Sequence, residues 1–208
     1  MPAQAKSKEA VRRARNEAYR ALILEAAEHV FAERGYREAK VQEIAEQAGV
    51  ATGTVYGIFP GKQELYRAVH RTNLDALAAR YRELSVSGFG TQHILLERTR
   101  IAIEFLTSRP SYLRIYLQES DQWGLDPLDL PALATAFMDL DLYRYGVEEG
   151  ELIDEDPEVL QGIAMSISRV VLFHWLRSGM KESPRELTLR IQGHYTRAFF
   201  RGGAPDSV

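Results

Sequence analysis

The sequence predicts an all-α protein of about nine helices, and three observations lead to this fold class. Apolar residues recur every three or four positions along most of the chain, which is the spacing of one helix face. No run of alternating apolar and polar residues reaches the length of a convincing strand. The composition is that of a soluble globular protein, because 45% of the 208 residues are hydrophobic and 26% are charged.

The first four helices follow from this spacing. An apolar stripe over residues 19–31 predicts a first helix that Gly35 ends. Short helices are predicted over residues 41–48 and 52–59. A long fourth helix begins near Lys62 and continues to the break in the sequence SVSGFG, so it is long enough to leave one domain and enter a second.

Five more helices are predicted in the rest of the chain. They cover residues 94–105, a segment opened by Pro110, and residues 132–147, 160–175 and 187–199. The Gly, Pro and Asp content of residues 121–131 predicts a loop, and residues 148–157 form a second, acidic loop.

The stretch GVATGTVYGIFPGKQ, residues 49–63, allows two interpretations. A phosphate-binding loop has two glycines separated by four residues, then Lys and a hydroxyl residue, between a strand and a helix. Here Gly57 and Gly61 are separated by three residues, and Gln63 stands in place of the hydroxyl residue. Since the preceding segment has helical spacing, a nucleotide site is disfavoured.

A helix-turn-helix fits the same stretch better. Gly49 follows the last apolar residue of a helix, where a positive φ can end it. Thr52 is a suitable N-cap for the next helix, which Val55, Ile58 and Phe59 pack down and Pro60 stops. In such a module the second helix lies in the DNA major groove.

Charge is unevenly distributed although the net charge is only -3. Residues 1–20 contain six Lys or Arg against two Glu, and we expect residues 1–18 to be a basic flexible arm. Such an arm is either a solvated tail or a contact to phosphates. Residues 119–158 are acidic, with Arg144 as their only basic residue, and we expect them to face away from a polyanion.

These residues resemble those of the tetracycline-repressor-like (TetR/AcrR) transcriptional regulators. The resemblance covers residues 20–69 and includes FAERGY, IAEQAGV and GTVYGIFPGKQEL in order and spacing. It implies a helix-turn-helix domain over residues 19–68 and a ligand-binding and dimerisation domain over residues 69–208. It further implies a homodimer that binds a palindromic operator and represses transcription until a small molecule binds.

The resemblance also implies which residues bind DNA. Hydroxyls, amides and ammonium groups donate to phosphate oxygens, and Thr also contacts the thymine methyl. The expected DNA-binding residues are Lys40, Gln42, Thr52, Gly53, Thr54, Tyr56, Gly57 and Lys62.

Candidate residues for the second domain come from the aromatic content and the apolar stripes. Aromatic and Met side chains line apolar pockets, although at helical spacing they also form cores. The ligand candidates are Tyr81, Phe105, Tyr112, Tyr116, Trp123, Phe137, Met138 and Phe173, with Trp123 as a gating position in its loop. Small residues on the helix over residues 160–175 favour close pairing with the last helix, either across a dimer interface or as internal core. The dimer candidates on these two helices are Ile163, Ile167, Val171, Trp175, Ile191, Tyr195 and Phe199.

Other classes of protein fit the sequence less well. The chain has no cysteine, no HxxxH spacing among its five histidines and no GxSxG elbow, so we expect no enzymatic activity, metal or cofactor. No uninterrupted apolar run spans a membrane and no signal peptide is evident, which predicts a cytoplasmic protein. The alternative is a helical adaptor or small-molecule-binding protein without specific DNA recognition.

Overall fold

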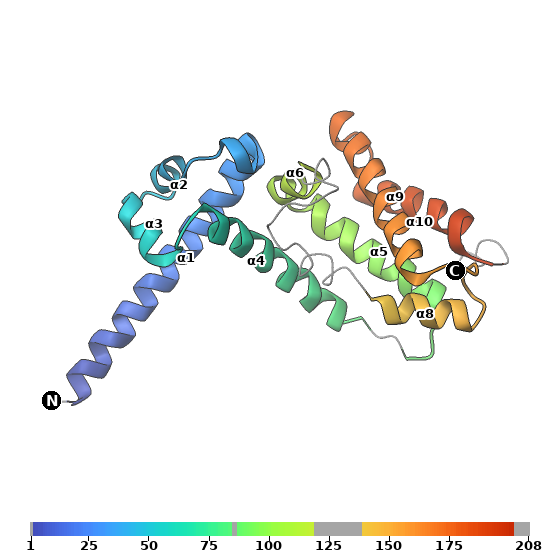
Figure 1. The fold of residues 1–208 in the computed structure, drawn as a ribbon, viewed down its shortest axis with the longest axis horizontal. Coiled ribbons are helices and arrows are strands. Elements are labelled where there is room, and N and C mark those ends of the chain that lie inside the picture. The colour runs from blue at the N-terminus through green and yellow to red at the C-terminus, as the bar shows by residue number, and fades with distance from the viewer. Residues whose placement is uncertain (1, 85–86, 119–138, 202–208) are drawn as a thin grey trace. The chain divides into compact units, whose positions relative to one another are not determined.

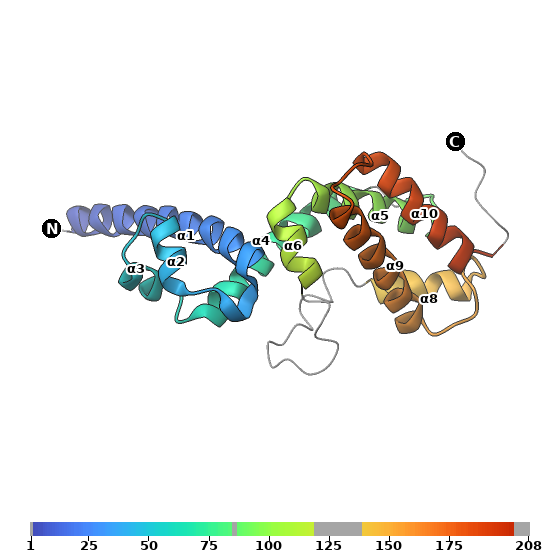
Figure 2. The same cartoon turned by 90° about the horizontal axis from the view of Figure 1, so that it is seen from above.

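The computed structural model describes residues 2–84, 87–118 and 139–201 (Figures 1 and 2). Within these ranges the chain forms nine helices, and the one β-type pairing is an isolated bridge between Leu152 and Phe200. The predicted all-α fold class is therefore confirmed.

The helices begin and end close to where the apolar spacing predicts. They are α1 (Pro2–Glu38), α2 (Val41–Gln47), α3 (Thr52–Ile58), α4 (Lys62–Arg82), α5 (Thr91–Thr107), α6 (Pro110–Gln118), α8 (Leu140–Glu148), α9 (Pro157–Arg177) and α10 (Pro184–Phe199). The expected loop over residues 121–131, and the first part of the expected helix over 132–147, lie outside the described residues. The acidic segment connects α8 to α9.

The chain divides into two compact units. The first unit comprises residues 1–73 and 111–128, and the second comprises residues 74–110 and 129–208. Helix α4 contributes residues to both units, and the second boundary falls just after Pro110, the first residue of α6. The described part of α6 thus belongs to the same unit as the predicted helix-turn-helix.

The first unit is built around α1. The side chains of Ile23, Phe31, Ile44 and Leu65 are fully buried there. An edge-to-face contact with ring centroids 5.0 Å apart joins Phe31 of α1 to Tyr66 of α4. These contacts fix α2 and α3 on a rigid support.

Helix α1 is longer than expected. Gly35 interrupts it at φ +74°, as predicted, but the helix begins at Pro2, so residues 2–18 are helical where a flexible arm was expected. Ala, Lys, Arg and Glu dominate this segment, and all four favour the helix. The described side chains from Glu9 to Ala18 are exposed, so intrinsic propensity rather than packing accounts for this extension.

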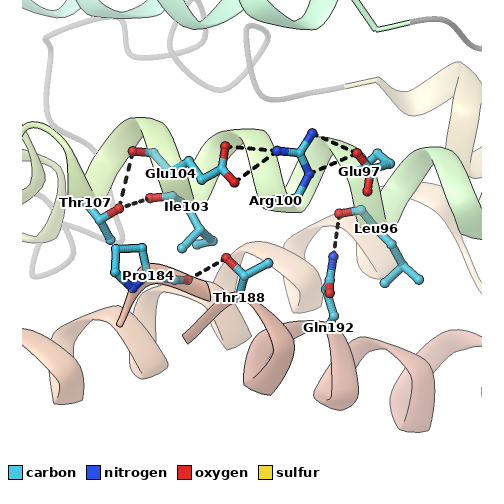
Figure 3. A network of polar contacts seen from close by, with 9 residues as sticks. All are labelled: Leu96, Glu97, Arg100, Ile103, Glu104, Thr107, Pro184, Thr188 and Gln192. Atoms are coloured by element: carbon cyan, nitrogen blue, oxygen red, sulfur yellow. Dashed lines mark hydrogen bonds and ion pairs between the residues drawn. The ribbon is translucent and has the colours of Figure 1, made fainter. Parts of the chain in front are cut away.

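In the second unit, α10 packs against α5 and α9, while α8 packs against α9 and α5. Figure 3 shows Gln192 of α10 donating its amide N–H to the Leu96 carbonyl of α5 at 2.9 Å. The Tyr195 hydroxyl of α10 donates to the Ala164 carbonyl of α9 at 2.8 Å. Helix α10 is therefore hydrogen-bonded to both of its neighbours.

Helix α9 is unusually apolar. Among the described residues it is the one helix that is long and apolar enough to cross a membrane by composition, yet only 28% of its apolar window is buried inside the protomer. The exposed large side chains on α9 are Val159, Ile163, Val170 and Phe173. An apolar face of this kind is expected to be covered by a partner.

Candidate nucleic-acid interface

The turn between α2 and α3 has the predicted geometry. Gly49 adopts φ +67°, and the N–H of Val50 donates to the Ala45 carbonyl at 3.0 Å. At the start of α2, the backbone N–H of Lys40 donates to a Glu43 carboxylate oxygen at 3.3 Å. Glu43 thus helps to cap α2 where Lys40 has no side-chain acceptor.

Helix α3 begins at Thr52, as predicted, but Thr52 is not its N-cap. Ala51 occupies the cap position, without a side-chain hydrogen bond, and its carbonyl accepts the N–H of Thr54 at 2.8 Å. The buried face of α3 matches the expectation, since Val55 and Phe59 are 1% and 3% exposed. The two apolar residues press the helix onto the rest of the first unit.

The opposite face of α3 is formed by Gly53, Tyr56 and Gly57, at the three- and four-residue spacing of one helix face. All three are exposed, and a Cβ atom added at Gly53 or Gly57 would meet no atom of the described chain within 4 Å. Packing therefore does not require glycine at either position, although each glycine weakens a helix relative to alanine. The consequence is a helix face whose backbone a ligand can approach closely.

The other predicted DNA contacts differ in their accessibility. Lys40 and Gln42 are exposed beside α2, whereas Thr52 and Thr54 are half-buried. The Lys62 ammonium donates to the carbonyls of Arg37 and Ala39 at 2.9 and 3.0 Å. It fastens the start of α4 to the end of α1, and a contact of its remaining donor to phosphate stays a prediction.

Comparison with known proteins identifies this segment. Residues 23–69 match the model of a family described as bacterial regulatory proteins, tetR family. The chain belongs to the TetR family. The matched residues include α2, α3 and the turn between them, so the family assignment rests on the same residues as the candidate interface.

Two curated relatives with which the chain shares sequence are transcriptional repressors. The repressor KstR2 of Rhodococcus jostii is 33% identical over 97 residues, which are 47% of this chain and 48% of that protein. KstR2 of Mycobacterium tuberculosis is 30% identical over 132 residues, 62% of this chain and 66% of that protein. The chain thus matches about half to two thirds of the length of these relatives.

Solved structures show the same fold over most of the chain. The fatty-acid regulator FadR of Bacillus subtilis, in complex with stearoyl-CoA, superposes with a TM-score of 0.71. The superposition covers 83% of this chain and 95% of FadR at 21% sequence identity. The second unit therefore has the TetR-family fold even where the sequence similarity has faded.

The candidate ligand residues are divided between the two units. Tyr81 is half-buried under the Arg98 guanidinium, 4.4 Å from its ring centroid, and Phe105 is fully buried. Tyr112 and Tyr116 of α6 lie in the first unit, with Tyr112 fully buried.

The other four ligand candidates are an exposed residue and three residues that the structure does not describe. Phe173 is 48% exposed on the surface of α9, and its role in ligand binding stays a prediction. An apolar residue on a helix stripe has the same spacing whether it faces inward or outward, and the sequence does not separate the two. Trp123, Phe137 and Met138 lie outside the described residues.

The second unit also holds buried polar groups. Arg98 forms an ion pair with Asp139 at 2.7 Å, and the two charges face Tyr143. Burial raises the pKa of the Tyr143 phenol to about 12, with Arg98 opposing and Asp139 adding to the shift. Tyr143 therefore stays a neutral hydrogen-bonding group at physiological pH.

Gln161 of α9 is the other such group. It is 2% exposed, and within the described part of the chain neither its amide nitrogen nor its amide oxygen has a hydrogen-bond partner. An uncompensated buried amide destabilises a fold. Its signal in the sequence is a lone polar residue beside Leu160 on the buried side of α9.

We expect Gln161→Leu to raise the free energy of unfolding by about 1–3 kcal/mol in the absence of any effector, because it removes this unsatisfied amide at similar volume. Denaturant unfolding measures the change. Gln192→Leu is the matched control, since it breaks the bond to Leu96 and should destabilise. Equal destabilisation by both variants contradicts the prediction.

The dimer candidates divide into surface and core residues. Ile163 is exposed, and Ile167 and Val171 are half-buried. The remaining candidates are buried inside the protomer, which corrects their expected place at the interface: they are Trp175, Ile191, Tyr195 and Phe199. The face that is open instead, here called the α9 stripe, consists of Val159, Ile163, Val170 and Phe173, with Leu189 exposed on α10.

Proposed function

We propose that this protein is a ligand-responsive transcriptional repressor that binds a palindromic operator as a homodimer. The observation that carries the proposal is the glycine-bearing exposed face of α3 within the segment that matches the TetR family. The repressor activity of the KstR2 relatives supports it. Acting on the chromosome, the protein would work in the cytoplasm and without catalysis.

The proposed contacts to DNA follow from the exposed face of α3. Tyr56 offers a hydroxyl to the phosphate backbone, while Gly53 and Gly57 let the helix backbone approach the groove. Lys40 and Gln42 add donors from the start of α2. A dimer presents two such helices to half-sites about one helical turn, or roughly 34 Å, apart.

The proposed effector is an apolar, lipid-like molecule. FadR of Bacillus subtilis is described in complex with stearoyl-CoA, a long acyl thioester, and its fold covers most of this chain. In the second unit, Tyr81 and Phe105 supply apolar surface. Tyr143 and Gln161 supply buried hydrogen-bonding groups that suit a carbonyl.

Release from the operator requires that the effector bind one conformation more tightly than the other. Helix α4 contributes residues to both units and begins where Lys62 is fastened to the end of α1. A displacement of α4 on effector binding would therefore move α3. A shift of a few ångströms is enough to lose the match with two half-sites.

Selection of bound duplexes from a random DNA pool tests the proposal, followed by titration of the selected duplex. We expect an inverted repeat, weakened binding by Tyr56→Ala, and about tenfold weaker binding by Gly57→Ala, whose methyl group would separate the helix from the groove. Because alanine favours the helix, Gly57→Ala should also raise stability by about 0.5–1 kcal/mol, which separates a weakened DNA interface from misfolding.

The alternative is a helical adaptor that binds proteins or small molecules alone. No enriched sequence, together with weak binding even at low salt, would favour that alternative. An enriched sequence whose affinity is unchanged by both variants would move DNA recognition away from α3.

A further inference from the structure

The extension of α1 carries charges that are separated on two sides of the helix. At 100° per residue, Arg12 and Arg15 lie on one side, and the backbone position of Lys8 has the same register. Glu9, Arg13 and Glu17 lie together on the adjoining side. Glu9 and Glu17, the two acidic residues between positions 9 and 20, therefore do not lie on the side of Arg12 and Arg15.

The ion pair between Arg13 and Glu9 lies on only one of these two sides of the helix. Arg13 pairs with Glu9 at 2.7 Å, on the side of the helix that carries the acidic residues. Arg12 and Arg15 have exposed side chains and take no part in that pair. They form a basic stripe on a helix whose neighbouring side is already neutralised.

Helix α1 passes α3 near Arg20, and the basic stripe lies farther along the same helix, toward the N-terminus. The Arg20 guanidinium is 4.6 Å from the ring centroid of Phe59, the residue that follows α3, so α1 passes α3 at this point. Figures 1 and 2 both show α1 continuing past α3 toward the N-terminus. With a rise of 1.5 Å per residue, Arg15 and Arg12 are about 8 and 12 Å farther along the axis from Arg20.

We propose that the basic stripe of α1, formed by Arg12 and Arg15, binds phosphates of the duplex that flanks each operator half-site. The inference rests on the proposed operator binding and extends it to a second contact surface. Guanidinium groups bind phosphate through paired N–H donors, and each phosphate neutralised releases counterions. The extended helix thereby adds affinity without adding base recognition.

An anionic membrane is the other polyanion that a basic helix can bind. Interfacial membrane helices combine their basic residues with a broad apolar face. Among the described side chains of residues 9–18, Val11 is the one that is large, hydrophobic and exposed. The segment lacks such a face, so its chemistry favours DNA.

The test uses the full-length chain and two selected duplexes, one trimmed to the inverted repeat and one with about ten base pairs of flanking DNA on each side, enough for the extension to reach. Binding of the wild type, of Arg12→Ala/Arg15→Ala and of Arg13→Ala is measured over a range of salt concentrations. Arg13→Ala is the matched control because its charge is paired with Glu9.

On the long duplex, we expect the double variant to reduce the slope of log K against log salt by about one unit for each phosphate that it no longer neutralises, up to about four per dimer. On the trimmed duplex the double variant should bind as the wild type does, and Arg13→Ala should change neither slope. Equal slopes for wild type and double variant on the long duplex would overturn the inference.

Two further outcomes keep this inference distinct from the proposed function. If the wild type binds no duplex specifically, the proposed function itself fails. If Arg12 and Arg15 are required for binding to phosphatidylglycerol vesicles but leave the operator slope unchanged, the basic stripe serves a membrane and the inference is overturned.

Discussion

Replacing Val170 with Asp should convert the proposed homodimer to a monomer and lower its operator affinity at least about 100-fold. Val170 is 69% exposed at the centre of the α9 stripe. In a two-fold interface the same patch meets itself, so one substitution places two carboxylates in the interface. Burying an unpaired charge costs several kcal/mol, and this cost weakens dimerisation enough to favour the monomer.

The loss of operator affinity follows from the loss of the dimer. A monomer presents one α3 helix to one half-site, and it forfeits the effective concentration that links the second binding event to the first. Light scattering coupled to size exclusion measures the oligomeric state, and a titration with the selected operator measures affinity. Both measurements are needed, because a folded monomer must be distinguished from an unfolded chain.

Tyr145→Asp is the matched control for this prediction. Tyr145 is 54% exposed on α8, in the same unit as Val170 but on a different helix from the α9 stripe. It should leave both the dimer and the operator affinity unchanged. A Val170→Asp protein that remains a dimer would show that α9 is not the interface and that another surface must cover its exposed apolar residues.

The corrected dimer face shows where sequence reasoning succeeded and where it could not. The positive φ of Gly49 and the burial of Val55 and Phe59 were predicted correctly, because both depend on local sequence and on residue type. An apolar stripe, in contrast, has the same helical spacing whether it meets the core or a partner. Ile191 and Val170 differ only in which side of their helices the rest of the unit covers, and that is a property of tertiary packing.

The candidate ligand site was predicted less completely for a related reason. Aromatic content suggests Tyr81 and Phe105 as candidates but not Gln161, whose burial without partners in the described chain depends on the packing of α9. Similarly, the clamp formed by Lys62 depends on carbonyls more than 20 residues earlier in the chain. Contacts of that sequence separation leave no local pattern in the sequence.

Tyr112→Phe should leave operator affinity nearly unchanged while raising the effector concentration needed for release by about tenfold, a coupling change of about 1.4 kcal/mol. The Tyr112 hydroxyl lies 3.3 Å from Nδ1 of His70, and the His70 ring contacts Tyr66 with centroids 4.6 Å apart. Tyr66 in turn packs on Phe31 and Tyr36 at the base of the helix-turn-helix.

Helix α6 is suited to transmit a change because of its place in the chain. Two residues separate it from the end of α5, which belongs to the second unit, yet Tyr112 packs within the first. Gln118 at its other end donates to the Ala32 carbonyl of α1 at 3.0 Å. A movement of α5 on effector binding would therefore reach α1 and α4 through both ends of α6.

The substitution separates coupling from stability. Phenylalanine keeps the ring contacts of Tyr112 and removes only the hydroxyl, so the loss of stability should be limited to about 1 kcal/mol. Effector titrations of preformed operator complexes measure the response, with Tyr145→Phe as a matched exposed control. If Tyr112→Phe responds as the wild type does, the His70 contact is structural, and the signal must travel through the continuous helix α4 instead.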